Sequence, residues 1–216
     1  MKKTTLALLV TLPLSAMTLQ GCFPVVAVGA GTAVVRMEDR RTGGTQIEDE
    51  GIELRAGNRI SERFGDKVHI NVTSYNRAVL LTGEAPDAAT KSAIEAIVRA
   101  VPNVRPGGIT NDIMIAVPSS LGARSNDSFI TSKVKARFLD ARKFNPVHVK
   151  VVTEAGVVYL LGMVTEREAA DAVEITRTTG GVRKVVKVFE ICRPTDELCR
   201  PSAAPRGEEP KAKADK

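Results

Sequence analysis

Two short stretches decide the fold, HINVT (His69–Thr73) and VLLTG (Val79–Gly83), and they recur 79 residues later as HVKVV (His148–Val152) and VYLLG (Val158–Gly162). Each stretch is rich in β-branched and apolar residues, and a few turn-forming residues separate the members of each pair. The pattern predicts two β-hairpins. Their turns are expected around Tyr75–Arg77 and Glu154–Gly156. Because the two hairpins are alike, the chain contains an internal repeat of one small module.

Apolar residues at helical spacing precede each hairpin. In the second copy Ile130, Val134 and Phe138 follow one another at i, i+4 and i+8, which places them on one face of a helix. Asn126–Ser128 supplies candidates for the N-cap of this helix. The first copy has a less regular version of the same pattern between Ile52 and Ile60.

A second helix and a third strand follow each hairpin. Thr165–Glu168 fits a capping box at the start of one second helix, and Pro86 stands where a first-turn proline belongs in the other. Third strands are predicted at Ile113–Val117 and Val185–Ile191. The predicted fold class is therefore α+β, with two tandem αββαβ domains, each a three-stranded mixed sheet with two helices.

The N-terminus predicts export. Lys2 and Lys3 precede an apolar segment, Leu6–Leu14, and the motif Leu19–Cys22 follows it. This is the pattern of a secretory signal, and the apolar segment is too short for a transmembrane helix. The ending Leu-Gln-Gly-Cys resembles the lipobox of bacterial lipoproteins, in which a signal peptidase cuts before the cysteine and the cysteine is acylated.

The lipobox resemblance implies that Cys22 is the first residue of the mature protein and carries three acyl chains. At about 0.8 kcal/mol for each buried CH₂ group, three chains anchor a protein stably. Phe23, and not Asp, follows the cysteine, which under the sorting rule of enterobacterial lipoproteins implies the periplasmic face of the outer membrane. The expected segments are a signal peptide at 1–21, a lipidated tether at 22–48, domains at 49–117 and 125–191 with a linker at 118–124, and a disordered tail at 192–216.

Two further cysteines, Cys192 and Cys199, lie near the C-terminus. They form an even pair in an exported chain, which permits one disulfide. Two free thiols on the tail are the alternative, and the residue pattern does not decide between them.

The αββαβ order, the repeated glycines Gly83 and Gly162, and the small residues before each last strand resemble BON domains. Two such domains behind a lipobox, with Ser125–Ser128 opening the second and Gly162–Ala169 inside it, resemble the dual-BON-domain outer-membrane lipoproteins, the DolP-like family. The resemblance covers residues 19–191. It implies that the second domain binds anionic phospholipid, notably phosphatidylglycerol, and it implies enrichment at division sites and a link to outer-membrane protein assembly.

Charge distinguishes the two copies. Between Asp49 and Val117 eight basic residues stand beside nine acidic ones, whereas between Ser125 and Ile191 there are eleven basic and eight acidic residues. The excess gathers on the first helix of the second copy and just after it, at Lys133, Lys135, Arg137, Arg142 and Lys143. Phe129, at the expected start of this helix, and Leu139, near its end, fall off the predicted core face.

Basic side chains beside exposed apolar ones suit an anionic lipid surface. On the residues alone, an ordinary solvated helix face accounts for this pattern better. The resemblance to the DolP-like family reverses that preference. The positions that match the family's phospholipid-binding surface are Phe129, Lys133, Val134, Lys135 and Leu139. Val134 also belongs to the predicted core face, and the family has tryptophan where this chain has Phe129, which predicts weaker membrane insertion.

No enzymatic chemistry is predicted. The two histidines of the chain, His69 and His148, occupy equivalent positions of the repeat, where a structural role is expected. A catalytic base needs a nucleophile or an orienting acid, and zinc needs three or four converging ligands. The sequence contains no motif that promises either cluster, so no catalytic residue, metal, cofactor or small-molecule substrate is expected. Nucleic acid is a poor partner as well, because the basic residues lack interleaved aromatic ones and export places the domains in the periplasm.

The expected function is that of an anchored, non-enzymatic module that binds phosphatidylglycerol through its second BON domain and supports outer-membrane integrity. The alternative is an interaction scaffold. In that case the same surface would dock a subunit of the outer-membrane protein assembly machinery or a component of the cell wall.

Overall fold

The computed structural model describes residues 39–193 and 195–199, which belong to one compact unit. The predicted signal peptide, Cys22, most of the tether and the last part of the tail lie outside the described residues. None of the described helices is both long enough and apolar enough to cross a membrane.

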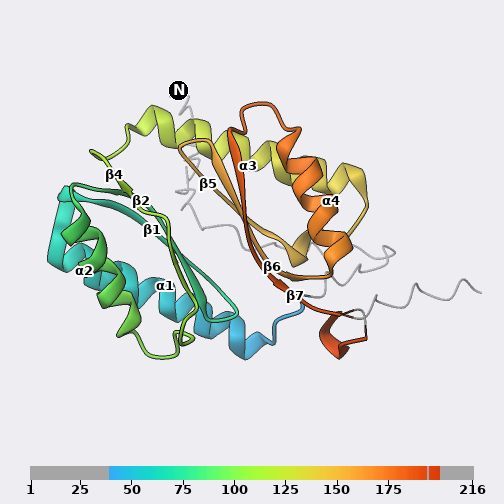
Figure 1. Ribbon diagram of the computed structural model, residues 1–216, viewed down its shortest axis with the longest axis horizontal. Helices are drawn as coiled ribbons and strands as arrows, with labels where there is room; N and C mark the ends of the chain where they lie inside the picture. Colours follow the sequence, from blue (N-terminus) through green and yellow to red (C-terminus); the bar gives the residue numbers. More distant parts are fainter. Residues whose placement is uncertain (1–38, 194, 200–216) are drawn as a thin grey trace, which may run out of the picture. The chain divides into compact units, whose positions relative to one another are not determined.

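The first repeat has the predicted αββαβ order, with a divided last strand (Figure 1). Its elements are α1 (Gly43–Phe64), the 3-10 helix η1 (Gly65–Lys67), β1 (His69–Tyr75), β2 (Ala78–Ala85), α2 (Ala88–Arg99), β3 (Ile109–Asn111) and β4 (Met114–Ile115). Strands β1 and β2 form an antiparallel hairpin, and β3 and β4 both run parallel to β2. The prediction of one strand at Ile113–Val117 is confirmed only for β4, because the strand begins at Ile109 and the buried Ile113 lies in the gap that divides it.

The second repeat has the same order with an undivided last strand. Its elements are α3 (Leu121–Ala141), the 3-10 helix η2 (Pro146–His148), β5 (Lys150–Glu154), β6 (Val157–Val164), α4 (Glu166–Arg177) and β7 (Lys184–Ile191), and a last 3-10 helix, η3 (Glu197–Cys199), follows. Strand β5 pairs with β6 in antiparallel orientation, and β7 pairs with β6 in parallel orientation along its whole length.

Both first helices begin earlier than predicted. Thr42 caps α1, since its side chain accepts a hydrogen bond from the N–H of Thr45, and Ser120 caps α3 through the N–H of Ala123. Helix α1 therefore begins inside the segment expected as the tether, and α3 begins inside the segment expected as the linker. Consequently Phe129 lies about two turns inside α3 and not at its start.

Asp127, predicted among the N-cap candidates, has a different role. Its carboxylate accepts hydrogen bonds of 2.8 Å from both N–H groups of Ala155–Gly156, in the β5–β6 turn. Asp49 does the same for Asn76–Arg77, in the β1–β2 turn, at 2.7–2.9 Å. Both aspartates are buried, and the turn N–H groups need acceptors. Each first helix is thereby fixed to the hairpin of its own domain.

The repeated glycines lie inside the second strands and not at their ends. A Cβ atom at Gly83 would meet the carbonyl oxygen of His69 at 2.0 Å, and one at Gly162 would meet that of His148 at 2.1 Å. Gly83 also has φ +108°, a conformation that favours glycine. The glycine of the repeat therefore allows the backbone of the neighbouring chain segment to approach each second strand closely.

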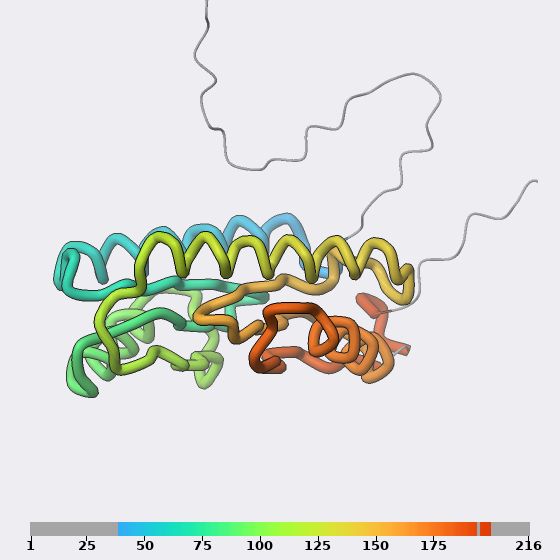
Figure 2. Tube along the Cα trace, turned by 90° about the horizontal axis from the view of Figure 1, so that it is seen from above, coloured from blue at the N-terminus to red at the C-terminus, as the bar shows by residue number. Residues whose placement is uncertain are grey.

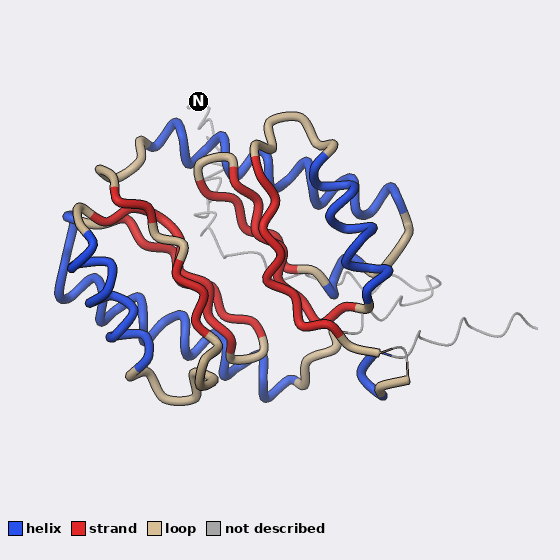
Figure 3. The backbone as a smooth tube through the Cα atoms, in the orientation of Figure 1, coloured by secondary structure: helices blue, strands red, loops and turns tan. Residues whose placement is uncertain are grey.

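Each domain has its own core between one sheet face and its two helices, and these elements are distinguished by colour in Figure 3. Ile130, Val134 and Phe138 are each at most 1% exposed, which confirms the predicted inward face of the helix. In the first domain Ile52 and Ile60 are buried in the equivalent way.

The helix-free faces of the two sheets contribute to a third apolar cluster. Side chains alternate along a strand, so Leu80 of β2 points away from its own domain's core, as do Tyr159, Leu161 and Met163 of β6. These four residues and Tyr75 are buried together. The two domains therefore share an apolar interface. At its polar edge the Tyr159 hydroxyl donates a 2.7 Å hydrogen bond to the carboxylate of Asp112.

Candidate functional site

An exposed apolar line runs along the outward face of α3, the continuous helix that Figure 2 shows in yellow-green to yellow. At about 100° per residue, Phe129, Ala136 and Leu139 lie on the side of the helix opposite the buried Val134. The exposed fraction is 62% for Phe129 and 55% for Leu139. These two side chains are separated by about 15 Å along the helix axis.

The structure places four of the five predicted phospholipid-binding residues at or near this surface. Lys135 is exposed and Lys133 is half-buried. Val134 is fully buried in the core of the second domain, so its side chain adds nothing to the surface. The core role of Val134 therefore excludes it from the candidate site.

Lys133 is held against Phe129. Its ammonium lies 4.8 Å from the centroid of the Phe129 ring and donates a hydrogen bond to the carbonyl oxygen of Gly180. The cation–π contact covers part of the ring and keeps a positive charge beside it. Lys133 thus supplies charge and also orients the most exposed aromatic side chain of α3.

Two other predicted basic residues have partners within the domain. Arg137 donates to the carbonyl oxygen of Ile175 at 2.8 Å and fastens α3 to α4. Lys143 forms a 2.9 Å ion pair with Asp171. Among the described residues, the side chains of Lys135 and Arg142 make no hydrogen bond or ion pair. Of the five predicted basic residues, these two therefore remain available to an external anion.

Sequence reasoning missed an extension of the apolar line. Leu121 is exposed and stands eighteen residues before Leu139, which is about five helical turns, so the two share one side of α3. Val117 and Ile115, just before the helix, are exposed too. The predicted linker boundary concealed this pattern, because Leu121 was assigned to the linker and not to the helix.

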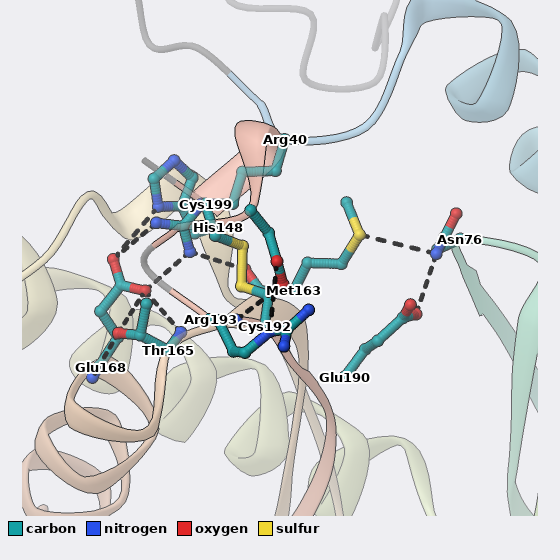
Figure 4. Close-up of a disulfide and its surroundings, with 11 residues drawn as sticks. Arg40, Asn76, His148, Met163, Thr165, Glu168, Glu190, Cys192, Arg193 and Cys199 are labelled. Carbon is teal, nitrogen blue, oxygen red and sulfur yellow. Dashed lines mark hydrogen bonds and ion pairs between the residues drawn. A yellow bond between two sulfur atoms is a disulfide. The ribbon is translucent and has the colours of Figure 1, made fainter. Parts of the chain in front are cut away.

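Arg40 joins the end of the tether to the second domain (Figure 4). Its guanidinium donates to both carboxylate oxygens of Glu168, at 2.7 and 2.9 Å, and to the carbonyl oxygen of Met163 at 2.8 Å. Glu168 completes the capping box of α4 with Thr165, as predicted. Although burial opposes it, hydrogen bonds from His148 and Arg40 hold the pKa of Glu168 well below its ordinary value.

Cys192 and Cys199 are joined in a disulfide, one of the two alternatives left open by the sequence (Figure 4). Cys199 is buried, and the N–H of Cys192 donates to the carbonyl oxygen of Val164 at 3.0 Å. The prediction of a disordered tail from residue 192 is therefore wrong for its described part, because the disulfide and this hydrogen bond hold the segment to the second domain.

Comparison with known proteins identifies both repeats. Residues 49–115 and 126–193 match the BON domain family. The chain is 35% identical over 174 residues to the outer membrane lipoprotein DolP of Haemophilus influenzae, in an alignment that covers 80% of this chain and 89% of that protein. It is 34% identical over 156 residues to a 21 kDa hemolysin of Actinobacillus pleuropneumoniae, covering 71% of this chain and 79% of that protein.

Among solved structures, the C-terminal domain of CdsD, a structural protein of the type III secretion system of Chlamydia trachomatis, aligns with 67% of this chain and 67% of its own. The sequence identity is 12% and the TM-score is 0.27, a likeness too weak to inform this chain.

Proposed function

This chain belongs to the BON-domain family and is an outer-membrane lipoprotein of the dual-BON, DolP-like type, and on that premise we propose that α3 of its second domain binds anionic phospholipid. One observation carries the proposal: Phe129 and Leu139 are exposed on one side of α3, and the nearby Lys135 and Arg142 make no hydrogen bond or ion pair within the described part of the chain. Apolar side chains can enter the interfacial layer while the cations meet lipid phosphates.

The size of this surface predicts weak binding by the domain alone. Full burial of a Leu or Phe side chain contributes about 1.5–3 kcal/mol, so the exposed parts of Phe129 and Leu139 contribute about 1–2 kcal/mol each. Lys135 and Arg142 add about 1 kcal/mol each near an anionic surface. A total of about 4–6 kcal/mol corresponds to a Kd between about 0.04 and 1 mM.

Weak binding is sufficient for an anchored protein. The lipobox predicts acyl chains on Cys22, which lies outside the described residues. A second membrane contact on the same chain is then made at an effective concentration in the millimolar range. At such concentrations the α3 surface would be occupied wherever anionic lipid is abundant. We further propose that the lipid is phosphatidylglycerol and that this binding supports outer-membrane integrity. Its expected consequences are recruitment to division sites and contact with the outer-membrane protein assembly machinery.

The test is co-sedimentation of acyl-free protein with vesicles of phosphatidylglycerol or phosphatidylethanolamine at low and high salt. The protein should comprise residues 37–216, because Arg40 and Arg41 make contacts within the folded unit. We expect binding to phosphatidylglycerol alone, and we expect added salt to weaken it because the Debye length shortens.

Two matched variants locate the surface. Phe129→Glu should abolish sedimentation with phosphatidylglycerol, because it places a negative charge at the centre of the apolar line. Leu54→Glu is the control, since Leu54 of α1 is 65% exposed, much like Phe129, but lies in the first domain. An equal loss of sedimentation in both variants, or no binding of the wild type to either vesicle, would contradict the proposal and favour the scaffold alternative. Recovery of a defined subunit of the assembly machinery with the purified protein would then test that alternative.

A further inference from the structure

Three side chains with metal-binding atoms meet between the two helix-free sheet faces. His69 stands at the start of β1, Glu84 lies near the end of β2, and Glu154 ends β5 of the other domain. One ligand atom from each lies within 4.8 Å of those of the other two. Sequence reasoning could not have found this group, because the two glutamates come from different repeats and from different positions within them.

The two carboxylates are buried with few hydrogen bonds. Glu84 is 3% exposed and Glu154 is 4% exposed. Glu84 accepts a hydrogen bond from the N–H of Ser119 at 3.2 Å, and Glu154 accepts one from the side-chain amide of Asn71 at 2.6 Å. A carboxylate has about four acceptor positions, and two buried carboxylates repel one another unless a cation lies between them.

Within the described ranges, no cationic side chain forms a hydrogen bond or ion pair with Glu84 or Glu154. Arg124 interacts electrostatically with His69 and Glu154, but its guanidinium donates a hydrogen bond to Ser119. The imidazole of His69 makes no hydrogen bond or ion pair among the described residues. Acceptor capacity on all three side chains therefore remains for a ligand.

Thr82 provides an independent indication on the same sheet face. It is 1% exposed, and its hydroxyl has no hydrogen-bond partner among the described residues. Thr82 and Glu84 are two residues apart on β2, so they share a face, and the residues paired with them across the hairpin are Asn71 and His69. A buried hydroxyl without a hydrogen-bond partner is unfavourable, and a water held by a bound ion would supply that partner.

Repeat symmetry provides an internal comparison. The counterpart of His69 is His148, but the residue 79 positions after Glu84 is Met163, and the residue 79 positions before Glu154 is Tyr75. The equivalent place at the other end of the interface thus has one histidine and no carboxylate at these positions. The cluster is consequently specific to one end of the domain interface and is not a feature that every copy of the module repeats.

We propose that His69, Glu84 and Glu154 bind a divalent transition-metal ion, with Zn²⁺ as the preferred ion, and that this ion ties the two BON domains together. Imidazole nitrogen and carboxylate oxygen are ordinary Zn²⁺ ligands, whereas Ca²⁺ and Mg²⁺ prefer all-oxygen sites. Zn–ligand distances of about 2.0–2.2 Å place donor atoms about 3.3 Å apart, so the three side chains draw together on binding. Three protein ligands leave the fourth position for a water, to which the Thr82 hydroxyl can hydrogen-bond.

The test uses the periplasmic chain, residues 23–216, stripped of metal with a chelator. Isothermal titration with ZnCl₂ should show one equivalent bound, and the melting temperature should rise with added Zn²⁺. MnCl₂ should bind more weakly than Zn²⁺, as the order of divalent metal affinities requires, and CaCl₂ should leave the melting temperature unchanged.

His69→Gln and Glu84→Gln should each weaken Zn²⁺ binding at least tenfold and remove the thermal shift. His148→Gln is the matched control, because it removes the only other histidine and should retain both. Circular dichroism checks that each variant is folded, and His69→Gln tests the site if Glu84→Gln fails to fold. The absence of a one-equivalent Zn²⁺ site in the wild type, or its loss in His148→Gln and retention in His69→Gln, would overturn the proposal.

Discussion

The contact between Arg40 and Glu168 predicts that the end of the tether stabilises the second BON domain. Arg40 is almost fully buried and makes a bidentate pair with Glu168 in addition to its hydrogen bond to Met163. Arg40→Ala should therefore destabilise the protein, although Arg40 precedes the first BON domain in the sequence.

The expected loss of stability follows from the burial of Arg40 and from the groups of Glu168 and Met163 that would lose their hydrogen bonds. Removal of one partner of a buried ion pair typically costs about 3–5 kcal/mol, because the other charge stays buried and unpaired. The Glu168 side chain retains 17% exposure and its capping-box hydrogen bonds from Thr165. Water and these hydrogen bonds reduce the cost, so we expect about 2–3 kcal/mol for Arg40→Ala. For a chain of this size that corresponds to a fall in Tm of roughly 4–12 °C.

Urea unfolding of the wild type, Arg40→Ala, Glu168→Gln and the double variant measures the coupling between the two side chains. We expect a coupling energy above about 1 kcal/mol, as is found for residues in one hydrogen-bonded network. Additive effects within about 0.3–0.5 kcal/mol would refute the inference that Arg40 acts through Glu168.

The same contact predicts a pH dependence. The pKa of Glu168 is lower in the folded state than its ordinary value of 4.5, so its stabilising contribution is present above that pH and is lost as the pH falls toward the folded pKa. Urea unfolding at pH 7 and at pH 3.5 should show a larger loss for the wild type than for Glu168→Gln. An equal loss in both proteins would contradict this assignment.

Three further predictions concern the frame of the domains. Gly83→Ala should destabilise the protein more than Gly162→Ala, because both create a backbone clash but only Gly83 has a positive φ. We expect each substitution to cost more than about 2 kcal/mol in thermal unfolding, and the reverse order of the two variants would contradict this reasoning. Thr165→Ala should cost about 1 kcal/mol of unfolding free energy through loss of the α4 cap, and no change in urea midpoint would show that Glu168 alone suffices. Replacing Cys192 and Cys199 by Ser should lower the unfolding free energy by at most about 2–3 kcal/mol, because the loop they close is short, and non-reducing mass spectrometry of the wild type should find no free thiol there.

Much of the fold follows from local patterns. The repeated hairpins have alternation and turn residues that are local signals, and Ile130, Val134 and Phe138 show their common face by spacing alone. The starts of α1 and α3 were less predictable, because Thr42 and Ser120 had competitors such as Asp127 that fit the same capping preference. Only the hairpin turn that Asp127 contacts in three dimensions shows which role it takes.

In the candidate sites too, some features follow from local sequence patterns and others depend on tertiary contacts. Exposure of Phe129 and Leu139 could be predicted from helical periodicity, because a residue off the core face of an amphipathic helix meets solvent unless another element covers it. Burial of Val134 follows from the same periodicity. In contrast, the partners of Arg137 and Lys143 lie on α4, more than twenty-five residues away, and no spacing rule indicates them.

From its sequence alone this protein is recognisable as two αββαβ modules behind a lipobox, because periodicity, caps and short motifs are properties of neighbouring residues. Only the tertiary structure decides which charges are neutralised internally, how Arg40 is held, and that His69 meets glutamates from both domains. Contacts of this kind depend on how the helix-free sheet faces come together. That arrangement is set by the summed burial of residues such as Leu80 and Tyr159, and no single segment of the chain contains the information.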